Sequence, residues 1–299
     1  MKSTISKNKN NLKNNDHDKK DYVECYNCRS NNYTYFDTEF GYDLVKCCNC
    51  GLLYVNPRPS EEYITNASRM GMHKNERIKN VTGKYHRNKV KIYHSVLADL
   101  YPGYDFNGKN LKWLDIGCGF GEFIEAVETY SKGHVKASGI DPNLEKINSA
   151  KNRGLNVKSD SLENINEKYD FISLLNVYSH LPDPVKFLNE LVTKLNTNGE
   201  LLLQTGDVSH LPRKYHPKPY DLPDHLSFAN KDIVISILEN AGFEILNIRL
   251  YRASIYPKYY ELIKILKLFV KIIIRRGERI DFLYPRYPDI DMYVRCRLK

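Results

Sequence analysis

The sequence contains no apolar run of the roughly 20 residues that a membrane-spanning helix needs, so we expect no such helix. Residues 1–20 are rich in Asn and Lys and lack the apolar core of a secretion signal. We therefore expect a cytoplasmic protein whose seven cysteines stay reduced. The low hydrophobic content of residues 1–20 also predicts a disordered tail.

An excess of positive charge is missing from the middle of the chain. The formal net charge is +9, but residues 1–20 contribute +4 and residues 256–299 contribute +6. The residues between them carry 28 basic and 29 acidic side chains. An enzyme that acts on nucleic acid more often carries a basic stripe on its main domains, so nucleic acid is the less favoured partner. The length of 299 residues allows one large domain and one small one.

The most informative segment is residues 111–123, LKWLDIGCGFGEF. An apolar run that contains Asp115 leads into Gly117, Gly119 and Gly121, and helix-forming residues follow. This order predicts a buried strand, a tight glycine turn and the start of a helix. Glycines have no Cβ, so the backbone can approach a bound cofactor closely. The spacing G-x-G-x-G differs from the G-x-G-x-x-G pattern that binds a dinucleotide pyrophosphate.

This segment resembles motif I of the class I methyltransferases that depend on S-adenosylmethionine (SAM). An acid at the strand end, Asp115, suits the cationic amino group of SAM better than it would suit a phosphate. Asp141 follows Gly121 by twenty residues, at the end of a second predicted strand. A Rossmann-type fold places a carboxylate there on the ribose hydroxyls.

The resemblance continues through the next strands and covers residues 111–243. It implies that Asp160 contacts the adenine amino group and that Leu162 contacts the adenine ring. In the segment that resembles motif IV, it places residues 176–180, beginning with Asn176, at the floor of the site. Five strand–helix steps predict an α/β fold with a mostly parallel, Rossmann-like sheet, helices on both faces and an antiparallel last strand.

Four cysteines near the N-terminus form two C-x2-C pairs, Cys25 with Cys28 and Cys47 with Cys50. Four thiolates at this spacing can close a tetrahedral zinc site on two knuckle turns. A small unit of this kind cannot bury enough apolar surface to fold without such a staple. A pair of disulfides is the alternative, which a reducing cytoplasm disfavours. We therefore predict a structural zinc ribbon ahead of the methyltransferase-like domain.

The segment after the second pair, CGLLYVNPRP (50–59), resembles a group of bacterial and archaeal methyltransferases with an N-terminal zinc ribbon. Many of these are associated with surface-polysaccharide or sugar metabolism. A family of rRNA guanine methyltransferases also begins with a zinc site, but that site usually mixes Cys and His, and no matching His lies near Cys47. The predicted division is a tail (1–20), the ribbon (21–60), a helical linker or cap over the cofactor (61–105) and the SAM-binding domain (106–299).

Residues 207–228 carry four prolines among aromatic, histidine and basic residues, which predicts a long, stiff lid over the site. Its polar side chains suit an anionic, hydroxyl-bearing acceptor such as a phosphorylated or nucleotide-linked sugar; an ordinary surface loop is the alternative. These side chains are Arg213, Lys214, His216, Lys218 and Tyr220. A hydroxyl acceptor needs a base, and His225 and His180 are the candidates because histidine titrates near neutrality; both could instead be structural.

Residues 259–276 place Lys264, Lys267, Lys271 and Arg275 on one face of a predicted, otherwise aliphatic helix. Such a helix packs on the domain or forms a homodimer seam more often than it lies on a membrane surface. The sequence thus predicts a SAM-dependent methyltransferase that modifies a small molecule or glycan, with an RNA methyltransferase and a non-catalytic SAM-binding scaffold as alternatives.

Overall fold

The computed structural model describes residues 20–74, 77–80, 83–107, 110–216, 218–252 and 289–299. The predicted tail, except Lys20, and the predicted helix 259–276 lie outside these residues. In the described part of the chain, no helix is both long and apolar enough to cross a membrane.

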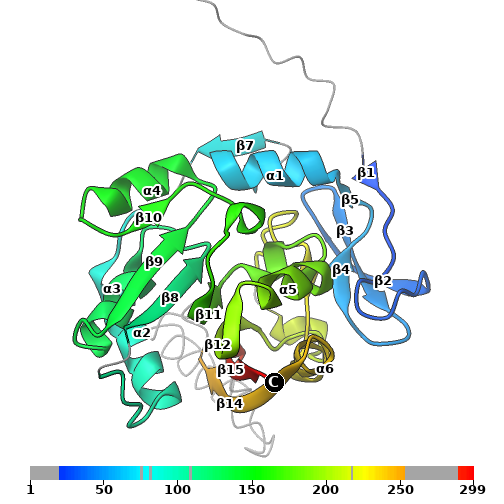
Figure 1. Ribbon diagram of the computed structural model, residues 1–299. Helices are drawn as coiled ribbons and strands as arrows, with labels where there is room; N and C mark the ends of the chain where they lie inside the picture. Colours follow the sequence, from blue (N-terminus) through cyan, green and yellow to red (C-terminus); the bar gives the residue numbers. More distant parts are fainter. Residues whose placement is uncertain (1–19, 75–76, 81–82, 108–109, 217, 253–288) are drawn as a thin grey trace, which may run out of the picture.

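The strands and helices follow one another from an N-terminal group of strands into an alternating α/β region (Figure 1). The strands are β1 (Lys20–Asp21), β2 (Tyr33–Glu39), β3 (Tyr42–Cys47), β4 (Leu53–Val55), β5 (Arg58–Pro59), β6 (Gly71–Lys74), β7 (Arg77–Asn80), β8 (Leu111–Ile116), β9 (Val135–Ile140), β10 (Val157–Lys158), β11 (Tyr169–Leu175), β12 (Leu195–Gly206), β13 (Ser227–Phe228), β14 (Phe243–Tyr251) and β15 (Asp291–Leu298). The α-helices are α1 (Glu61–Met70), α2 (Arg87–Leu100), α3 (Glu122–Tyr130), α4 (Leu144–Lys151), α5 (Pro184–Val192) and α6 (Lys231–Asn240), and three short 3-10 helices are η1 (Leu162–Asn164), η2 (Tyr178–His180) and η3 (Arg213–Tyr215).

The main sheet has seven strands in the order β10-β9-β8-β11-β12-β15-β14. Its first five strands run parallel, and β15 pairs antiparallel with both β12 and β14. The predicted Rossmann-like sheet with an antiparallel last strand is therefore confirmed. Because β8 and β11 lie side by side at the centre, their carboxyl ends open onto one edge of the sheet, where ligands bind in folds of this type.

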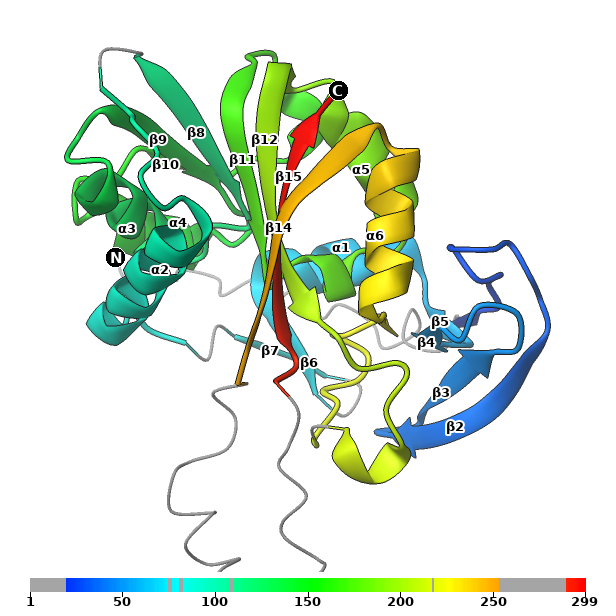
Figure 2. The same ribbon diagram turned by 90° about the horizontal axis from the view of Figure 1, so that it is seen from below.

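Helices cover both faces of this sheet (Figure 2). One apolar cluster joins Trp113 of β8 to residues of α2, α3 and α4. The other joins Leu114 of β8 to residues of α5 and α6, so neighbouring positions of the same strand supply opposite cores. Asn143 and Asp183 begin α4 and α5 by accepting a hydrogen bond from the backbone two or three residues into the helix.

The N-terminal strands β2, β3 and β4 form a second sheet, and β13 completes it from the far part of the chain. Ser227 and Phe228 of β13 pair antiparallel with Tyr54 and Leu53 of β4. The predicted lid 207–228 therefore ends as a strand of the ribbon sheet. The predicted helical linker also differs, since a β6–β7 hairpin separates α1 from α2.

Candidate active site

The glycine turn follows β8 and holds three left-handed residues, with φ of +72° at Gly117, +54° at Gly119 and +82° at Gly121. The N–H groups of Gly117 and Cys118 both donate to the carbonyl of Ile140, at 2.8 and 3.0 Å, which ties the turn to the end of β9. A Cβ at Gly117 would lie 2.3 Å from Val177 Cγ2, whereas one at Gly119 would meet no atom within 4 Å. The turn is therefore packed at its start and open beside Gly119, as a cofactor cradle requires.

Two buried acids lie beneath this turn. Asp141 accepts hydrogen bonds from the N–H of Gly119 at 2.9 Å and of Asn143 at 2.8 Å. Asp115 is 3% exposed and accepts a hydrogen bond of 2.5 Å from Ser173 Oγ. Burial raises the pKa of Asp115 to about 7, although the Ser173 hydroxyl opposes the shift. Asp115 is therefore an acid that a bound cation can ionise.

The remaining residues expected at the cofactor lie along the same edge of the sheet. Asp160 follows β10 and pairs with Lys158 Nζ at 2.9 Å. Leu162 is buried in η1, and Asn176 follows β11 as an exposed residue with φ of +57°. The carboxyl ends of β8, β9, β10 and β11 thus bring all the predicted cofactor residues to one side of the domain.

A segment before α2 crosses this edge and contacts α3. Tyr85 Oη donates to Glu125 at 2.8 Å, and the N–H of His86 donates to Glu122 at 3.1 Å. Arg153 lies over the Tyr85 ring at 4.0 Å and pairs with Glu125 at 3.0 Å. Sequence reasoning did not single out Glu125 or Arg153, because their partners are distant in the chain. These contacts hold the segment beside the glycine turn.

The structure brings the two predicted bases together. The rings of His180 and His225 lie 4.5 Å apart between centroids and nearly perpendicular, at 73°. His180 Nδ1 lies 2.7 Å from the backbone carbonyl of Asp224. A carbonyl only accepts, so Nδ1 carries the proton and Nε2 of the neutral ring keeps a lone pair.

Burial keeps both histidines neutral. It lowers the pKa of His180, which the Asp224 carbonyl partly opposes. Burial and the neighbouring His180 lower the pKa of His225 to about 3. Both rings are therefore held in the neutral form, which can accept a proton.

The predicted anion-binding side chains of the lid have a different partner from the one expected. Asp37 of β2, whose side chain is 3% exposed, accepts hydrogen bonds from Arg213, from Lys218 at 2.9 Å and from Tyr220 at 2.8 Å. His216 is buried against Phe36 and lies 3.2 Å from the carbonyl of Leu211. A buried carboxylate needs several donors, and the lid supplies them. Arg213, Lys218 and Tyr220 therefore attach the lid to the ribbon through Asp37.

The two C-x2-C pairs converge as predicted. The Sγ atoms of Cys25, Cys28, Cys47 and Cys50 lie within 4.8 Å of one another. The contacts Cys25–Cys50 and Cys28–Cys47 are both 3.5 Å, close to the roughly 3.8 Å edge of a ZnS4 tetrahedron with Zn–S bonds of about 2.3 Å. Four thiolates with this separation fit a zinc ion.

Comparison with known proteins agrees with the fold and the glycine turn. Residues 85–248, more than half of the chain, match the model of a family described as "Methyltransferase domain". The chain belongs to this methyltransferase family. It therefore contains a methyltransferase domain, and the glycine turn lies within the matched residues.

Curated relatives of the methyltransferase match it over part of their length. A tRNA U34 carboxymethyltransferase of Aliarcobacter butzleri is 32% identical over 155 residues, covering 46% of this chain and 49% of the relative. A ubiquinone biosynthesis O-methyltransferase of Parvibaculum lavamentivorans is 27% identical over 103 residues, covering 32% of this chain and 41% of the relative. The chain thus spans about half the length, or less, of these relatives.

Among solved structures, a SAM-dependent methyltransferase from Archaeoglobus fulgidus is 18% identical, with a TM-score of 0.49 over 71% of this chain and 94% of that one.

Proposed function

We propose that this methyltransferase transfers a methyl group from SAM to a hydroxyl of a small molecule or glycan, such as a sugar or a nucleotide- or phosphate-linked sugar. The observation that carries the proposal is the histidine pair after β11 and before β13. The Nδ1 contact to Asp224 leaves His180 a free Nε2 lone pair, and His180 follows the floor residue Asn176 by four positions in the chain. A hydroxyl, unlike a thiolate, needs such a base.

The cofactor residues have the roles that the family resemblance implies. The glycine turn (Gly117, Gly119 and Gly121) provides close backbone approach, and Asp115 pairs with the amino group. Asp141 receives the ribose hydroxyls, since each of its oxygens keeps a second lone pair beside its backbone bond. Asp160 and Leu162 bind the adenine, and Asn176 borders the reacting methyl group.

Bound SAM supplies a methyl group already activated on a sulfonium. His180 Nε2 would accept the hydroxyl proton of the acceptor, and the glycine turn with the acids at the strand ends would hold SAM. Most of the rate enhancement then depends on holding the acceptor oxygen in line with the S–C bond of SAM. His225 packs on the His180 ring and stays neutral, so it adds no charge that would repel the sulfonium.

We assign a structural zinc ion to Cys25, Cys28, Cys47 and Cys50. The Sγ separations support this choice, since four thiolates are a common ligand set for structural zinc. With all four ligands supplied by the protein, the ion has no open position, so its contribution is to folding.

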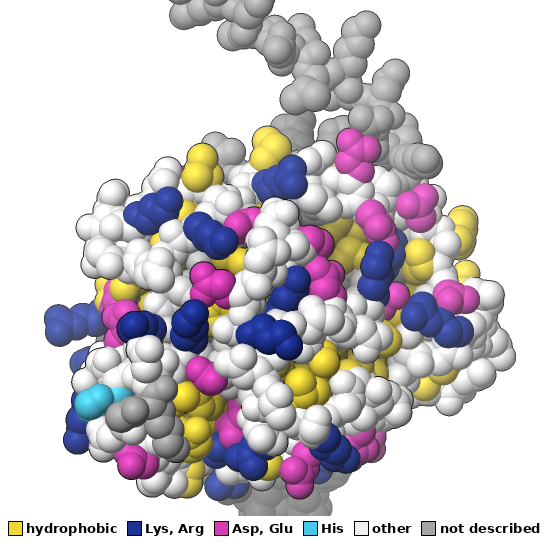
Figure 3. Space-filling model, viewed as in Figure 1, with side chains coloured by type: hydrophobic (Ala, Val, Ile, Leu, Met, Phe, Trp, Pro, Cys, Tyr) yellow, Lys and Arg dark blue, Asp and Glu magenta, His cyan; other side chains and the backbone are white. Residues whose placement is uncertain are grey.

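A tRNA is the second candidate acceptor, because several curated relatives are named as tRNA U34 carboxymethyltransferases. The charge of the ribbon and of one face of the molecule favours it less. The ribbon, residues 21–60, holds five acidic and three basic residues. On the face shown in Figure 3, basic and acidic side chains alternate without a broad basic patch. Phosphate binding depends on such a patch.

The test is methyl transfer from labelled SAM into an extract of the source organism, divided into glycan, small-molecule, lipid and ribonuclease-sensitive fractions. We expect label in the glycan or small-molecule fraction, and His180→Gln should lose it while still binding SAM. Asp141→Ala should lose both the label and SAM binding. It is the control that shows how loss of cofactor binding differs from loss of the base. Label that ribonuclease removes would replace the sugar proposal with tRNA, and full activity of His180→Gln would exclude the proposed base.

A further inference from the structure

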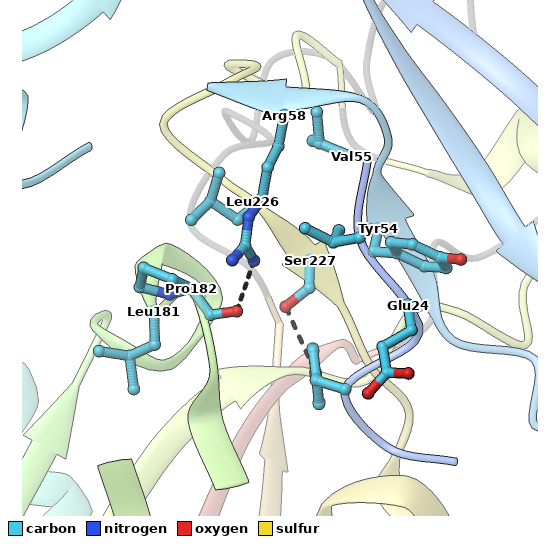
Figure 4. Close-up of a pocket in the computed structure, with 10 residues that line it drawn as sticks. Glu24, Tyr54, Val55, Arg58, Leu181, Pro182, Leu226 and Ser227 are labelled. Atoms are coloured by element: carbon cyan, nitrogen blue, oxygen red, sulfur yellow. Dashed lines mark hydrogen bonds between the residues drawn. The ribbon is translucent and has the colours of Figure 1, made fainter. Parts of the chain in front are cut away.

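The ribbon contacts the chain on both sides of His180. On one side, Tyr26 Oη lies 3.4 Å from the hydroxyl of Tyr178, two residues before His180. On the other side, Arg58 donates to the carbonyl of Pro182 at 2.6 Å, two residues after it. Figure 4 shows the Arg58 side chain reaching from the ribbon side to this carbonyl. His180 is therefore the middle residue of a five-residue segment whose ends are both bonded to the ribbon.

The ribbon contacts the chain on both sides of His225 as well. Before His225, the two carboxylate oxygens of Glu39 accept the N–H groups of Tyr220 and Leu222, both at 2.9 Å. After His225, the carbonyl of Leu226 accepts the N–H of Val55 at 2.9 Å. The N–H of the same Leu226 donates to Ser179 at 2.7 Å, so this residue links the ribbon to the turn that carries His180.

The side chain of Tyr26 connects the segment around His180 to the segment around His225. Tyr26 Oη lies 3.3 Å from Ser227 Oγ as well as 3.4 Å from Tyr178 Oη, and all three groups are buried. Tyr26 itself lies between Cys25 and Cys28, inside the first knuckle turn. The Tyr26 hydroxyl joins two other buried hydroxyls and so fixes their separation. Its removal would leave both of them without this partner.

We propose that Tyr26 and Arg58 are positioning residues, through which the ribbon sets the distance and orientation of the His180–His225 pair. The pairing of the two rings depends on two segments that are about 45 residues apart, 178–182 and 222–227, and both segments are bonded to the ribbon. The effect of this geometry on methyl transfer rests on the function proposed above. The arrangement of the two histidines does not rest on that function, so it can be measured without knowing the acceptor.

The test uses the full chain with ring-13C-labelled histidine, and the Cε1–H signals of the pair are assigned from His180→Gln and His225→Gln spectra. Tyr26→Phe removes one hydroxyl, and Arg58→Met removes the donor to Pro182 at similar length. Tyr22→Phe is the matched control, because Tyr22 is a ribbon-side tyrosine with 77% exposure. Melting temperature and SAM affinity are measured on the same samples.

We expect both test variants, and not Tyr22→Phe, to shift the His180 and His225 signals while SAM affinity stays unchanged. The rate of label incorporation should fall between roughly threefold and a hundredfold, since small displacements of a catalytic group cost this much. Unchanged histidine signals, with or without a lower melting temperature, would overturn the positioning role. Shifted signals with an unchanged rate would support the positioning role and overturn the catalytic role of the pair.

Discussion

Two buried acids of this protein have pKa values moved in opposite directions by their neighbours. Burial raises the pKa of Asp115, and a single hydroxyl from Ser173 only partly opposes it. Burial acts in the same direction on Asp37, but Lys218, Tyr220 and Arg213 outweigh it and hold the pKa of Asp37 below its usual range. Among the described residues, no cation contributes to the pKa shift of Asp115, whereas Asp37 already has cationic partners within the fold.

Binding of SAM should depend on pH through Asp115. The unliganded pKa is about 7, and pairing with the cationic amino group would lower it. Because SAM prefers the ionised acid, its affinity should rise as pH increases toward 7 and level off above it, with a slope approaching tenfold per pH unit on the acid side. Calorimetric titrations from pH 5.5 to 8.5 measure this, and Asp115→Asn should remove the slope. A wild-type affinity that is flat over this range would contradict the assignment.

Replacing Asp37 with Asn should loosen the attachment of the lid. The variant weakens charge-assisted bonds to a buried group, which costs about 2–4 kcal/mol and lowers the melting temperature by several degrees. The folded pKa of Asp37 is depressed, so its stabilisation is full above the unfolded pKa near 3.9 and is lost as pH falls below that value. Melting curves at pH 7 and pH 3 should therefore differ less for Asp37→Asn than for wild type. The exposed Asp43→Asn is the control, and an equal loss in it would refute the specific role of Asp37.

Among the elements, the glycine turn contains one glycine that packing requires, Gly121, and one that we assign to the ligand, Gly119. A Cβ at Gly121 would lie 2.4 Å from Leu155 Cδ1, but one at Gly119 would enter open space. Gly119→Ala should therefore fold with only the strain of its left-handed backbone, about 1 kcal/mol, and lose SAM affinity at least tenfold. Gly121→Ala should lose stability first. Melting and SAM titration of both variants decide this, and unchanged SAM affinity in Gly119→Ala would remove Gly119 from the cofactor site.

Local signals predicted the elements around this turn well. The apolar run 111–116 is β8, and the glycines expected to form the turn after it, Gly117, Gly119 and Gly121, all have positive φ. A turn that needs three left-handed residues restricts the sequence strongly, so its pattern is visible without an alignment. β10, at the edge of the main sheet, covers only Val157–Lys158, and two residues give no periodic signal in the sequence.

Contacts between distant elements could not be predicted in the same way. The lid was expected to present its basic side chains to an acceptor, and their partner Asp37 lies 176 residues before Arg213. Nothing in the local pattern of either segment distinguishes a buried ion pair from a ligand site. The addition of β13 to the ribbon sheet is similar, since two residues give no periodic signal. The two histidines were named as separate candidates, and only the fold brings them within contact.

At the scale of the molecule, the ribbon and the catalytic sheet share one core. Cys25, Tyr26 and Leu52 of the ribbon belong to the same buried apolar cluster as Leu174 of β11 and Val234 of α6. The ribbon sheet also includes β13, which follows the five parallel strands of the main sheet in the sequence. Two units that share a core, one of which takes a strand from the chain of the other, unfold together, unlike domains joined only by a linker.

Removal of the metal should therefore unfold the catalytic sheet together with the ribbon. The single tryptophan, Trp113, is 1% exposed in β8 and lies outside the ribbon, so its fluorescence reports on the catalytic sheet. During a chelator titration at fixed temperature, zinc release, read by a metal-sensitive dye, should coincide with the change in Trp113 fluorescence. Structural zinc contributes on the order of 10 kcal/mol in small zinc-binding units, so the change in Trp113 fluorescence should be large. Zinc release at constant Trp113 fluorescence would mean that the ribbon folds independently, and the shared core would not couple the two parts.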